Sequence, residues 1–385
     1  MPKLNLSNGK PKASVKKKPK LGVKKTSLRE SLRGGPSFLP KRKENNKVDF
    51  FHSGSIILNL AASQKAKNGG WARGRVINLV GDGSSGKTLL TLEAMANAYH
   101  TWKKTGNLPS HNFPAVKKLI LIYDNAEGVM DFPIEEMYGA DFVEHVNWIQ
   151  SPNCEAFGRN YLRKVRDLKS GECLIYAADS LDSMQSKAAL ERIDKSVEKD
   201  KDEDDAYGTE KAKYFSGSFF NSMCSYMEGK DATIFCISQI RENIGVRFGS
   251  KYKRAGGKAL DFYTHQVIWL REKKKLKRTF RGQERVYGVN TEGIFKRSKV
   301  AKPFRTAEFN ILFDYGIDDI NSMLAFLYGP EVKSISWGGV TIKRPDLIEI
   351  IDNDPKEYDA LVEAVTTEWN EIEDEMVPKR KARFT

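Results

Sequence analysis

The stretch Val76-Ile-Asn-Leu-Val-Gly-Asp-Gly-Ser-Ser-Gly-Lys-Thr-Leu-Leu-Thr-Leu92 decides the fold. An apolar run passes through a Gly/Ser-rich loop into a helical pattern, and the loop has the spacing G-x-x-x-x-G-K-[ST] of a phosphate-binding loop. Glycines let backbone N–H groups converge on a polyphosphate, and the helix presents its positive N-terminal end to it. The alternative, a glycine-rich turn that carries a lysine by chance, is disfavoured by the strand and helix on either side.

This loop assigns roles to individual side chains. We expect Lys87 to reach the β- and γ-phosphates and the Thr88 hydroxyl to bind Mg2+. The residues expected to surround the nucleotide are Gly81, Asp82, Gly83, Ser84, Ser85, Gly86, Lys87, Thr88 and Leu89.

The bulk composition is that of a globular protein. The chain has 385 residues, of which 40% are hydrophobic, and this length allows two domains or one large domain with appendages. No apolar stretch approaches the roughly eighteen residues of a transmembrane helix, and no apolar segment follows the basic N-terminus, so we expect neither a membrane partner nor a secretory signal. Four scattered cysteines fit reduced thiols, so we expect a cytoplasmic protein.

The positive charge is concentrated at the N-terminus. Residues 1–48 contain 15 Lys and Arg against two Glu, a net +13 of the chain's +14. We predict a basic, largely disordered tail that is attracted to phosphate backbones. A solubilising tail or a nuclear-import signal are the alternatives.

Short apolar runs that end in polar residues alternate with helical segments after the loop. Lys118–Asp124, Gly171–Asp179 and Thr233–Gln239 are such runs, and they predict an α/β fold with a mainly parallel, twisted sheet. Ligands bind at the carboxyl ends of these strands. We therefore expect Asp179 to hold Mg2+ through water; capping of the next turn is the alternative.

A second acidic segment, Asp124-Asn-Ala-Glu127, follows one of these runs. Hydrolysis needs a carboxylate that orients or deprotonates the attacking water. Glu127 is the candidate and Asp124 the alternative, and a surface acidic turn would explain the same residues without function.

The remaining chain divides into several predicted parts. Residues 187–213 suggest a mobile, solvated loop, and residues 241–257 mix cations, glycines and apolar residues as single-strand DNA binding requires, with a basic surface loop as the alternative. We expect strands at Leu260–Leu270, Val286–Thr291, Ile294–Arg297 and Ala307–Phe313 and a helix at Ile317–Tyr328. The predicted division is a tail 1–48, a core 49–329, a small α+β module 330–377 with helices at Pro345–Asp352 and Pro355–Ile372, and a basic tail 378–385.

From about Ser53 to Phe326 the chain resembles the RecA strand-exchange recombinases of bacteria and phages. The resemblance rests on Gly83-Ser-Ser-Gly-Lys-Thr88, on Ala126-Glu127 with Asp131, and on Gln239-Ile-Arg-x-x-Ile-Gly-Val-x-Phe-Gly249 followed by Gly256-Gly-x-Ala-Leu-x-Phe-Tyr263. It implies a RecA-like core that binds ATP and Mg2+ between subunits. It also implies a helical homo-oligomer on single-stranded DNA that pairs with homologous duplex DNA.

The resemblance also implies residue roles. It favours Glu127 as the catalytic carboxylate and implies that Gln239 senses the γ-phosphate. It also implies that Arg297 and Lys299 contact the ATP bound by the neighbouring subunit. It places Phe262 at the subunit interface. It adds Asp131 and Phe313 to the nucleotide contacts, and the DNA contacts expected from the second loop are Arg241, Asn243, Ile244, Gly245, Val246, Arg247, Lys251, Lys253, Arg254, Gly256 and Gly257. In the first loop the family's basic positions are not cleanly preserved, and Lys211, Lys213 or Arg241 are the candidates that replace them.

Several departures from the family pattern leave alternatives open. One extra residue precedes Glu127, which keeps Asp124 in play, and an acidic insertion occupies 191–205, with Asn221 at a position that is basic in the family. The N-terminal residues lack a clear neighbour-docking helix, and the C-terminal tail is basic where the family's is usually acidic. A helicase or motor on the same core, and a non-catalytic scaffold that binds nucleotide and DNA, are the rival functions.

Overall fold

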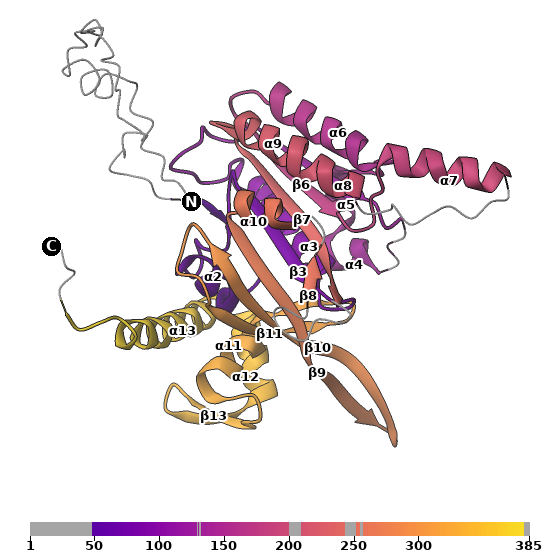
Figure 1. Ribbon diagram of the computed structural model, residues 1–385. Coiled ribbons are helices and arrows are strands. Elements are labelled where there is room, and N and C mark those ends of the chain that lie inside the picture. Colours follow the sequence, from indigo (N-terminus) through magenta and orange to yellow (C-terminus); the bar gives the residue numbers. More distant parts are fainter. Residues whose placement is uncertain are drawn as a thin grey trace, which may run out of the picture. The chain divides into compact units, whose positions relative to one another are not determined.

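A large mixed sheet forms the centre of the computed structural model, which describes residues 48–128, 130, 132–199, 209–242, 252–254 and 257–380 (Figure 1). Its strand order is β12-β11-β10-β9-β3-β7-β6-β4-β5, and β8 pairs with β7. The parallel half consists of β3 (Val76–Gly81), β7 (Ala232–Glu242), β6 (Glu172–Asp179), β4 (Lys118–Asn125) and β5 (Val146–Ile149). The predicted α/β fold with a mainly parallel sheet is confirmed.

The second half of the sheet is antiparallel. β9 (Gln266–Phe280) runs parallel to β3, and β10 (Gln283–Ser298), β11 (Thr306–Leu312) and β12 (Gly316–Asp318) follow in antiparallel order. β9 and β10 extend beyond the sheet as a long hairpin (Figure 1). Its turn, Arg281-Gly282, has φ angles of 48° and 74°, the left-handed conformation that a two-residue hairpin turn needs.

The strand prediction for Leu260–Leu270 was wrong in its first part. Residues Gly257–Tyr263 form the helix α10, and the strand begins only at Gln266. The outer part of the hairpin was missed because its residues are nearly all exposed and many of them are basic. A strand with neither face on the core carries no alternation of apolar and polar residues.

Two hydrophobic cores cover the two faces of the sheet. One contains Ile77 and Leu79 of β3 and packs against α2 (Ile56–Ser63), α3 (Lys87–Thr105) and the C-terminal helices. The other contains Val76 and packs against α6 (Cys154–Asp167), the π-helical turn η1 (Phe215–Phe219), α9 (Phe220–Met227) and α10. Neighbouring residues of one strand thus enter opposite cores, which is why its apolar run is continuous.

Short elements complete the description. They are β1 (Phe50–Phe51), β2 (Trp71–Ala72), α4 (Ile134–Tyr138), α5 (Ala140–His145) and β8 (Tyr252–Arg254). Among the described residues no helix is both long and apolar enough to cross a membrane.

The mobile loop predicted at 187–213 is largely helical where the structure describes it. α7 (Lys187–Lys199) and α8 (Thr209–Tyr214) lie on either side of residues 200–208, which are not described. Leu190, Ile193 and Val197 recur at helical spacing, a signal that the surrounding charges obscured. The Arg192 guanidinium binds both carboxylate oxygens of Glu210, at 2.8 and 2.9 Å, and so joins α7 to α8.

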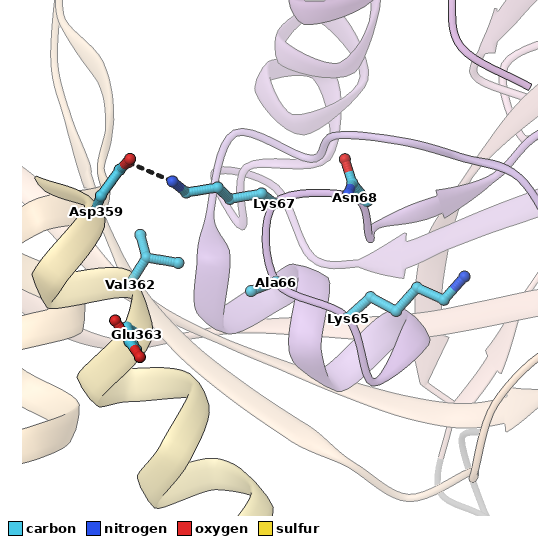
Figure 2. Close-up of a pocket in the computed structure, with 7 residues that line it drawn as sticks. All are labelled: Lys65, Ala66, Lys67, Asn68, Asp359, Val362 and Glu363. Carbon is cyan, nitrogen blue, oxygen red and sulfur yellow. Dashed lines mark hydrogen bonds and ion pairs between the residues drawn. The ribbon is translucent and has the colours of Figure 1, made fainter. Parts of the chain in front are cut away.

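The C-terminal elements are α11 (Asp319–Tyr328), the hairpin of β13 (Ser334–Trp337) and β14 (Val340–Lys343), α12 (Arg344–Asn353) and α13 (Pro355–Glu375). They share the first core, to which Leu347, Leu361 and Trp369 contribute. An ion pair between Lys67 and Asp359 joins the segment after α2 to α13 beside a groove of about 480 Å³ (Figure 2). Glu373 of α13 is nearly buried and pairs with Arg305 and Lys302, and Arg305 holds its pKa below the usual range.

A half-buried carboxylate on α3, that of Glu93, makes the stability of the fold dependent on pH. Glu93 lies against Gly54 and near Gly316. Burial raises its pKa from 4.5 to about 7, and the charge of Asp319 acts in the same direction, whereas a hydrogen bond from Asn97 opposes the shift. The folded chain therefore holds this proton more tightly than the unfolded chain. Its contribution to stability is present below about pH 4.5 and is lost as the pH rises through about 7.

Replacing Glu93 by Gln should remove this pH dependence. We expect the free energy of unfolding of Glu93→Gln, relative to the natural chain, to rise by about 3 kcal/mol between pH 4.5 and pH 8. Urea unfolding at several pH values measures it, with Glu144→Gln, an exposed glutamate on α5, as the control. Parallel pH profiles for Glu93→Gln and the natural chain would contradict the assignment.

Candidate nucleotide site

The phosphate loop lies between β3 and α3, as the sequence predicted. Steric constraints require glycine at two of its positions. A Cβ on Gly81 would lie 2.4 Å from Ser85 Oγ and 2.7 Å from Leu270 O, so no side chain fits there. Gly86 has φ +89°, and a Cβ on it would lie 2.4 Å from Ile311 Cδ1. The backbone can thus turn sharply between strand and helix, which leaves the N–H groups of the loop free to converge on phosphate oxygens.

Lys87 lies across this loop. Its ammonium donates to Asp82 O at 2.5 Å and lies 3.5 Å from Ser85 Oγ. Burial lowers the pKa of Lys87, and the nearby carboxylates of Asp179 and Glu127 oppose the shift. Asp82, Gly83 and Ser84 are exposed, whereas Lys87 is buried and Leu89 is half-buried against the core. The loop therefore presents a backbone cradle with a cation beneath it.

Asp179, at the end of β6, meets the start of α3. Its Oδ2 accepts hydrogen bonds from Thr88 Oγ1 at 2.7 Å and from Tyr123 OH at 2.6 Å. Burial raises the pKa of Asp179, while these two hydrogen bonds oppose the shift. A hydroxyl and a carboxylate in contact beside a phosphate cradle are the oxygen ligands that Mg2+ prefers, so the donor set fits this metal. Tyr123, which the sequence analysis missed, orients the carboxylate from β4.

Glu127 follows β4 and lies among polar side chains from two other strands. Its Oε1 accepts hydrogen bonds from Ser180 Oγ at 2.8 Å, from Ser183 Oγ at 3.2 Å and from Gln239 Nε2 at 2.8 Å. Glu127 itself is exposed. The two serines were missed, although Ser180-Leu-Asp-Ser183 directly follows a strand end, which is the signal that could have identified them.

Asp124, the alternative to Glu127, faces the interior. It is fully buried and accepts hydrogen bonds from Ser151 N, Ser151 Oγ and Tyr176 OH at 2.8, 2.6 and 2.6 Å. A carboxylate held by three donors in the core has no access to a water molecule at the loop. The geometry therefore favours Glu127 as the candidate base.

The predicted cations Arg297 and Lys299 lie at the opposite edge of the sheet. Arg297 pairs with Val267, which pairs with Asn78, three residues before Gly81. At about 3.3 Å per residue and about 5 Å per strand, Arg297 lies about 10 Å from Gly81 along the sheet and about 10 Å across it. Lys299 Nζ donates to Phe262 O at 2.6 Å, and Phe262 is 68% exposed on α10. Both cations therefore lie towards the end of the sheet that is opposite the phosphate loop.

The other predicted contacts have mixed positions. Phe313 is exposed just after β11, and its N donates to Tyr287 O at 3.0 Å. Lys211 donates to Asp182 O at 2.8 Å, and Asp182 Oδ2 in turn accepts from Gln239 N at 2.7 Å. Lys211 therefore lies near β7, the strand that carries Gln239. Lys213 is exposed, and Asn221 donates to Gly217 O at 3.2 Å.

Most predicted DNA contacts are not described in full. Asp131 and the DNA-loop positions Asn243, Ile244, Gly245, Val246, Arg247, Lys251 and Gly256 lie outside the described residues. The backbones of Arg241, Lys253 and Arg254 are described, and β8 pairs with the end of β7 through Arg241↔Lys253 and Ile240↔Arg254. Gly257 begins α10. The strand that carries Gln239 thus leads directly into the predicted DNA loop.

Comparisons with known proteins identify the family. The RecA N-terminal domain model matches residues 31–109 and 171–318, more than half of the chain. The chain belongs to the RecA family. Protein RecA of Bacteroides thetaiotaomicron is 31% identical over 295 residues, covering 75% of this chain and 77% of the relative; Protein RecA of Methylococcus capsulatus is 29% identical over 329 residues, covering 83% of each.

One solved structure also matches. The RadB recombinase crystal structure aligns with a TM-score of 0.44 and 14% identity, covering 70% of this chain and 99% of that one, a likeness too slight to bear on function. Family membership supports a P-loop ATPase of the recombinase class. The matched segments leave out residues 110–170, so the assignment of Glu127 depends on its geometry.

The metal assignment can be tested at Asp179. Replacing it by Asn keeps the hydrogen-bonding shape but removes the charge, so we expect the Mg2+ concentration for half-maximal ATP hydrolysis to rise about 10- to 100-fold. Tyr123→Phe, which removes only the orienting hydroxyl, should give a smaller rise. Titration of activity with Mg2+ at saturating ATP measures both. An unchanged Mg2+ dependence in Asp179→Asn would mean that Asp179 only caps the strand end.

Proposed function

We propose that this protein is an ATP-dependent DNA recombinase that polymerises on single-stranded DNA, pairs it with homologous duplex DNA and hydrolyses ATP at subunit interfaces. The observation that carries the proposal is the hydrogen bond between Gln239 and Glu127. It joins the candidate base to the strand that enters the predicted DNA loop. Nucleotide state and DNA contact would therefore be coupled within one chain.

In the proposed reaction, Glu127 orients the attacking water and takes its proton. All three bound donors reach Oε1, and within the described part of the chain Oε2 has no bound donor, so Oε2 is the atom that would accept the proton. Lys87 and the backbone of the loop hold the phosphates in line. Mg2+, when held by Thr88 and Asp179, supplies charge compensation for the phosphate oxygens.

Gln239 would act as the coupling element. Its Nε2 binds Glu127, and its backbone N binds Asp182. A γ-phosphate oxygen would compete with Glu127 for the same amide hydrogens. Binding of ATP would then release the carboxylate for catalysis and shift the end of β7, from which the predicted DNA loop continues.

The position of Arg297 and Lys299 supports a site completed by a neighbour. These cations lie at one edge of the sheet and the phosphate loop at the other. A head-to-tail contact would bring the cationic edge of one subunit to the loop of the next. Such a heterologous contact that does not close on itself generates a helical filament.

Two variants test the shared site. Glu127→Gln should lower DNA-stimulated ATP hydrolysis by at least about a hundredfold while filaments still assemble, because the phosphate and metal ligands remain. Arg297→Ala should also be inactive, since it removes a cation from the transition state. When the two inactive proteins are mixed in equal amounts, about a quarter of interfaces would contain an intact Glu127 and an intact Arg297, so activity should reappear.

Electron microscopy and strand exchange separate the rival functions. With a non-hydrolysable ATP analogue and single-stranded DNA, we expect continuous helical filaments, and with ATP we expect strand exchange. Closed rings of fixed size would favour a helicase or motor. Filaments without pairing activity, and normal function of Glu127→Gln, would favour a scaffold.

A further inference from the structure

A row of cations occupies the sheet edge opposite the phosphate loop. Arg75 directly precedes β3, His265 precedes β9, and Arg297 and Lys299 lie at the end of β10. Backbone hydrogen bonds hold them together, because His265 N donates to Val76 O at 2.8 Å and Lys299 N donates to His265 O at 2.8 Å. Arg75 thus lies at the same end of the sheet as the two predicted trans-acting cations.

Arg75 differs from the arginine two residues before it. Arg73 is buried and binds both carboxylate oxygens of Asp231, at 2.9 and 2.5 Å. Arg75 donates to Gly74 O at 3.0 Å, and within the described residues it forms no ion pair. Burial lowers the pKa of Arg75, yet a guanidinium remains protonated in proteins. Among the described residues, Arg75 is therefore a half-buried positive charge that forms no ion pair with a carboxylate.

The neighbouring side chains add to this charge. Burial lowers the pKa of His265 to about 4, and the charges of Arg75, Lys299 and Arg297 act in the same direction. Burial also lowers the pKa of Lys299, and Arg297 adds to the shift. His265 is neutral at pH 7, so it offers no compensation. Arg75, Arg297 and Lys299 repel one another, and the neutral imidazole of His265 does not offset this repulsion. An anion bound beside them would offset it.

A cavity beside Arg75 gives access to this edge. It has a volume of about 460 Å³. Its lining comes from the segment Gly74–Val76, from His265, Asn112 and Phe113, and from Cys224 and Met227 of α9 with the following residues Glu228, Gly229 and Lys230. Glu228 is the acidic residue of this lining, and within the described residues it pairs with no cation. The Arg75 guanidinium is therefore accessible from outside its own chain.

We propose that Arg75 is a third cation of the shared site and that it contacts the polyphosphate of the nucleotide held by the neighbouring subunit. The inference rests on the proposed function, because it requires the head-to-tail contact described above. A guanidinium presents paired N–H donors that match phosphate oxygens, which suits it to this position. The same phosphates would neutralise the repulsion among Arg75, Arg297 and Lys299, so assembly would depend on nucleotide.

Substitution of Arg75 in the full-length chain tests the inference. We expect Arg75→Gln to lower kcat/KM for DNA-stimulated ATP hydrolysis at least about tenfold, because a charge-assisted contact to phosphate is lost, and Arg75→Lys to retain more. Arg163→Gln, which removes one exposed charge from α6, should behave as the natural chain does. Filaments formed with a non-hydrolysable ATP analogue should dissociate at lower salt in Arg75→Gln, because fewer charges join the subunits.

Mixing experiments separate this inference from the proposed function. If Arg75 acts across the interface, Arg75→Gln mixed with Glu127→Gln should regain activity, as Arg297→Ala mixed with Glu127→Gln does. If only the mixture of Arg297→Ala with Glu127→Gln regains activity, the role of Arg75 is overturned, whereas the proposed shared site is supported. No recovery in either mixture would overturn both.

Folding of the variant is controlled separately. Thermal unfolding of Arg75→Gln checks that the chain remains native, and Arg75→Lys provides the second variant if the first does not fold. A native Arg75→Gln with unchanged kcat/KM and an unchanged salt midpoint of filament dissociation would overturn the inference. If Arg75→Gln does not fold, Arg75→Lys is tested in its place. The inference would then be overturned by an Arg75→Lys protein that is native and inactive and regains no activity when it is mixed with Glu127→Gln.

Discussion

The site depends on the parallel register of four strands. β3, β7, β6 and β4 run in the same direction, so Gly81, Gln239, Asp179 and Asn125 reach one edge together. From this edge the loop, the metal ligands and the candidate base are all presented on short connections. A slip of one residue in any strand would turn its final side chain to the other face of the sheet. Two buried cores, one on each face, hold that register.

The sequence could predict this edge because the constraints are local. The spacing from Gly81 to Thr88 reflects sterics within one turn, and the apolar runs before Asp179 and Gln239 reflect burial on both faces. The sequence alone could not predict which side chains of different strands contact one another. Nothing in the spacing distinguished Asp124 from Glu127; the difference is that Ser151 and Tyr176 bind Asp124 inside the core. The hairpin tip was missed because it does not pack on the core and so carries no apolar period. In α7 the apolar residues do recur at helical spacing, but the surrounding charges obscured them.

Two arginines two residues apart illustrate how context decides function. Arg73 and Arg75 both precede β3, and both sit at the edge away from the phosphate loop. Arg73 is neutralised by Asp231 within the chain, so its charge is used for structure. Arg75 has no such partner among the described residues, so its charge remains available to another molecule. The position of Asp231 beside Arg73 separates the two.

The antiparallel half of the sheet explains why Arg297 and Lys299 lie towards the end of the sheet opposite the phosphate loop. β9 begins at Gln266 beside the start of β3 and runs towards the loop, and β10 returns along it, so Arg297 and Lys299 end beside the start of β3. A parallel connection would have delivered them to the loop of the same chain. The hairpin instead places Arg297 about 10 Å from Gly81 along the strand direction. If Arg297 and Lys299 act on the nucleotide as proposed, a second copy stacked in the same orientation would complete the site. Because such stacking has no natural end, polymerisation would follow from the strand order itself.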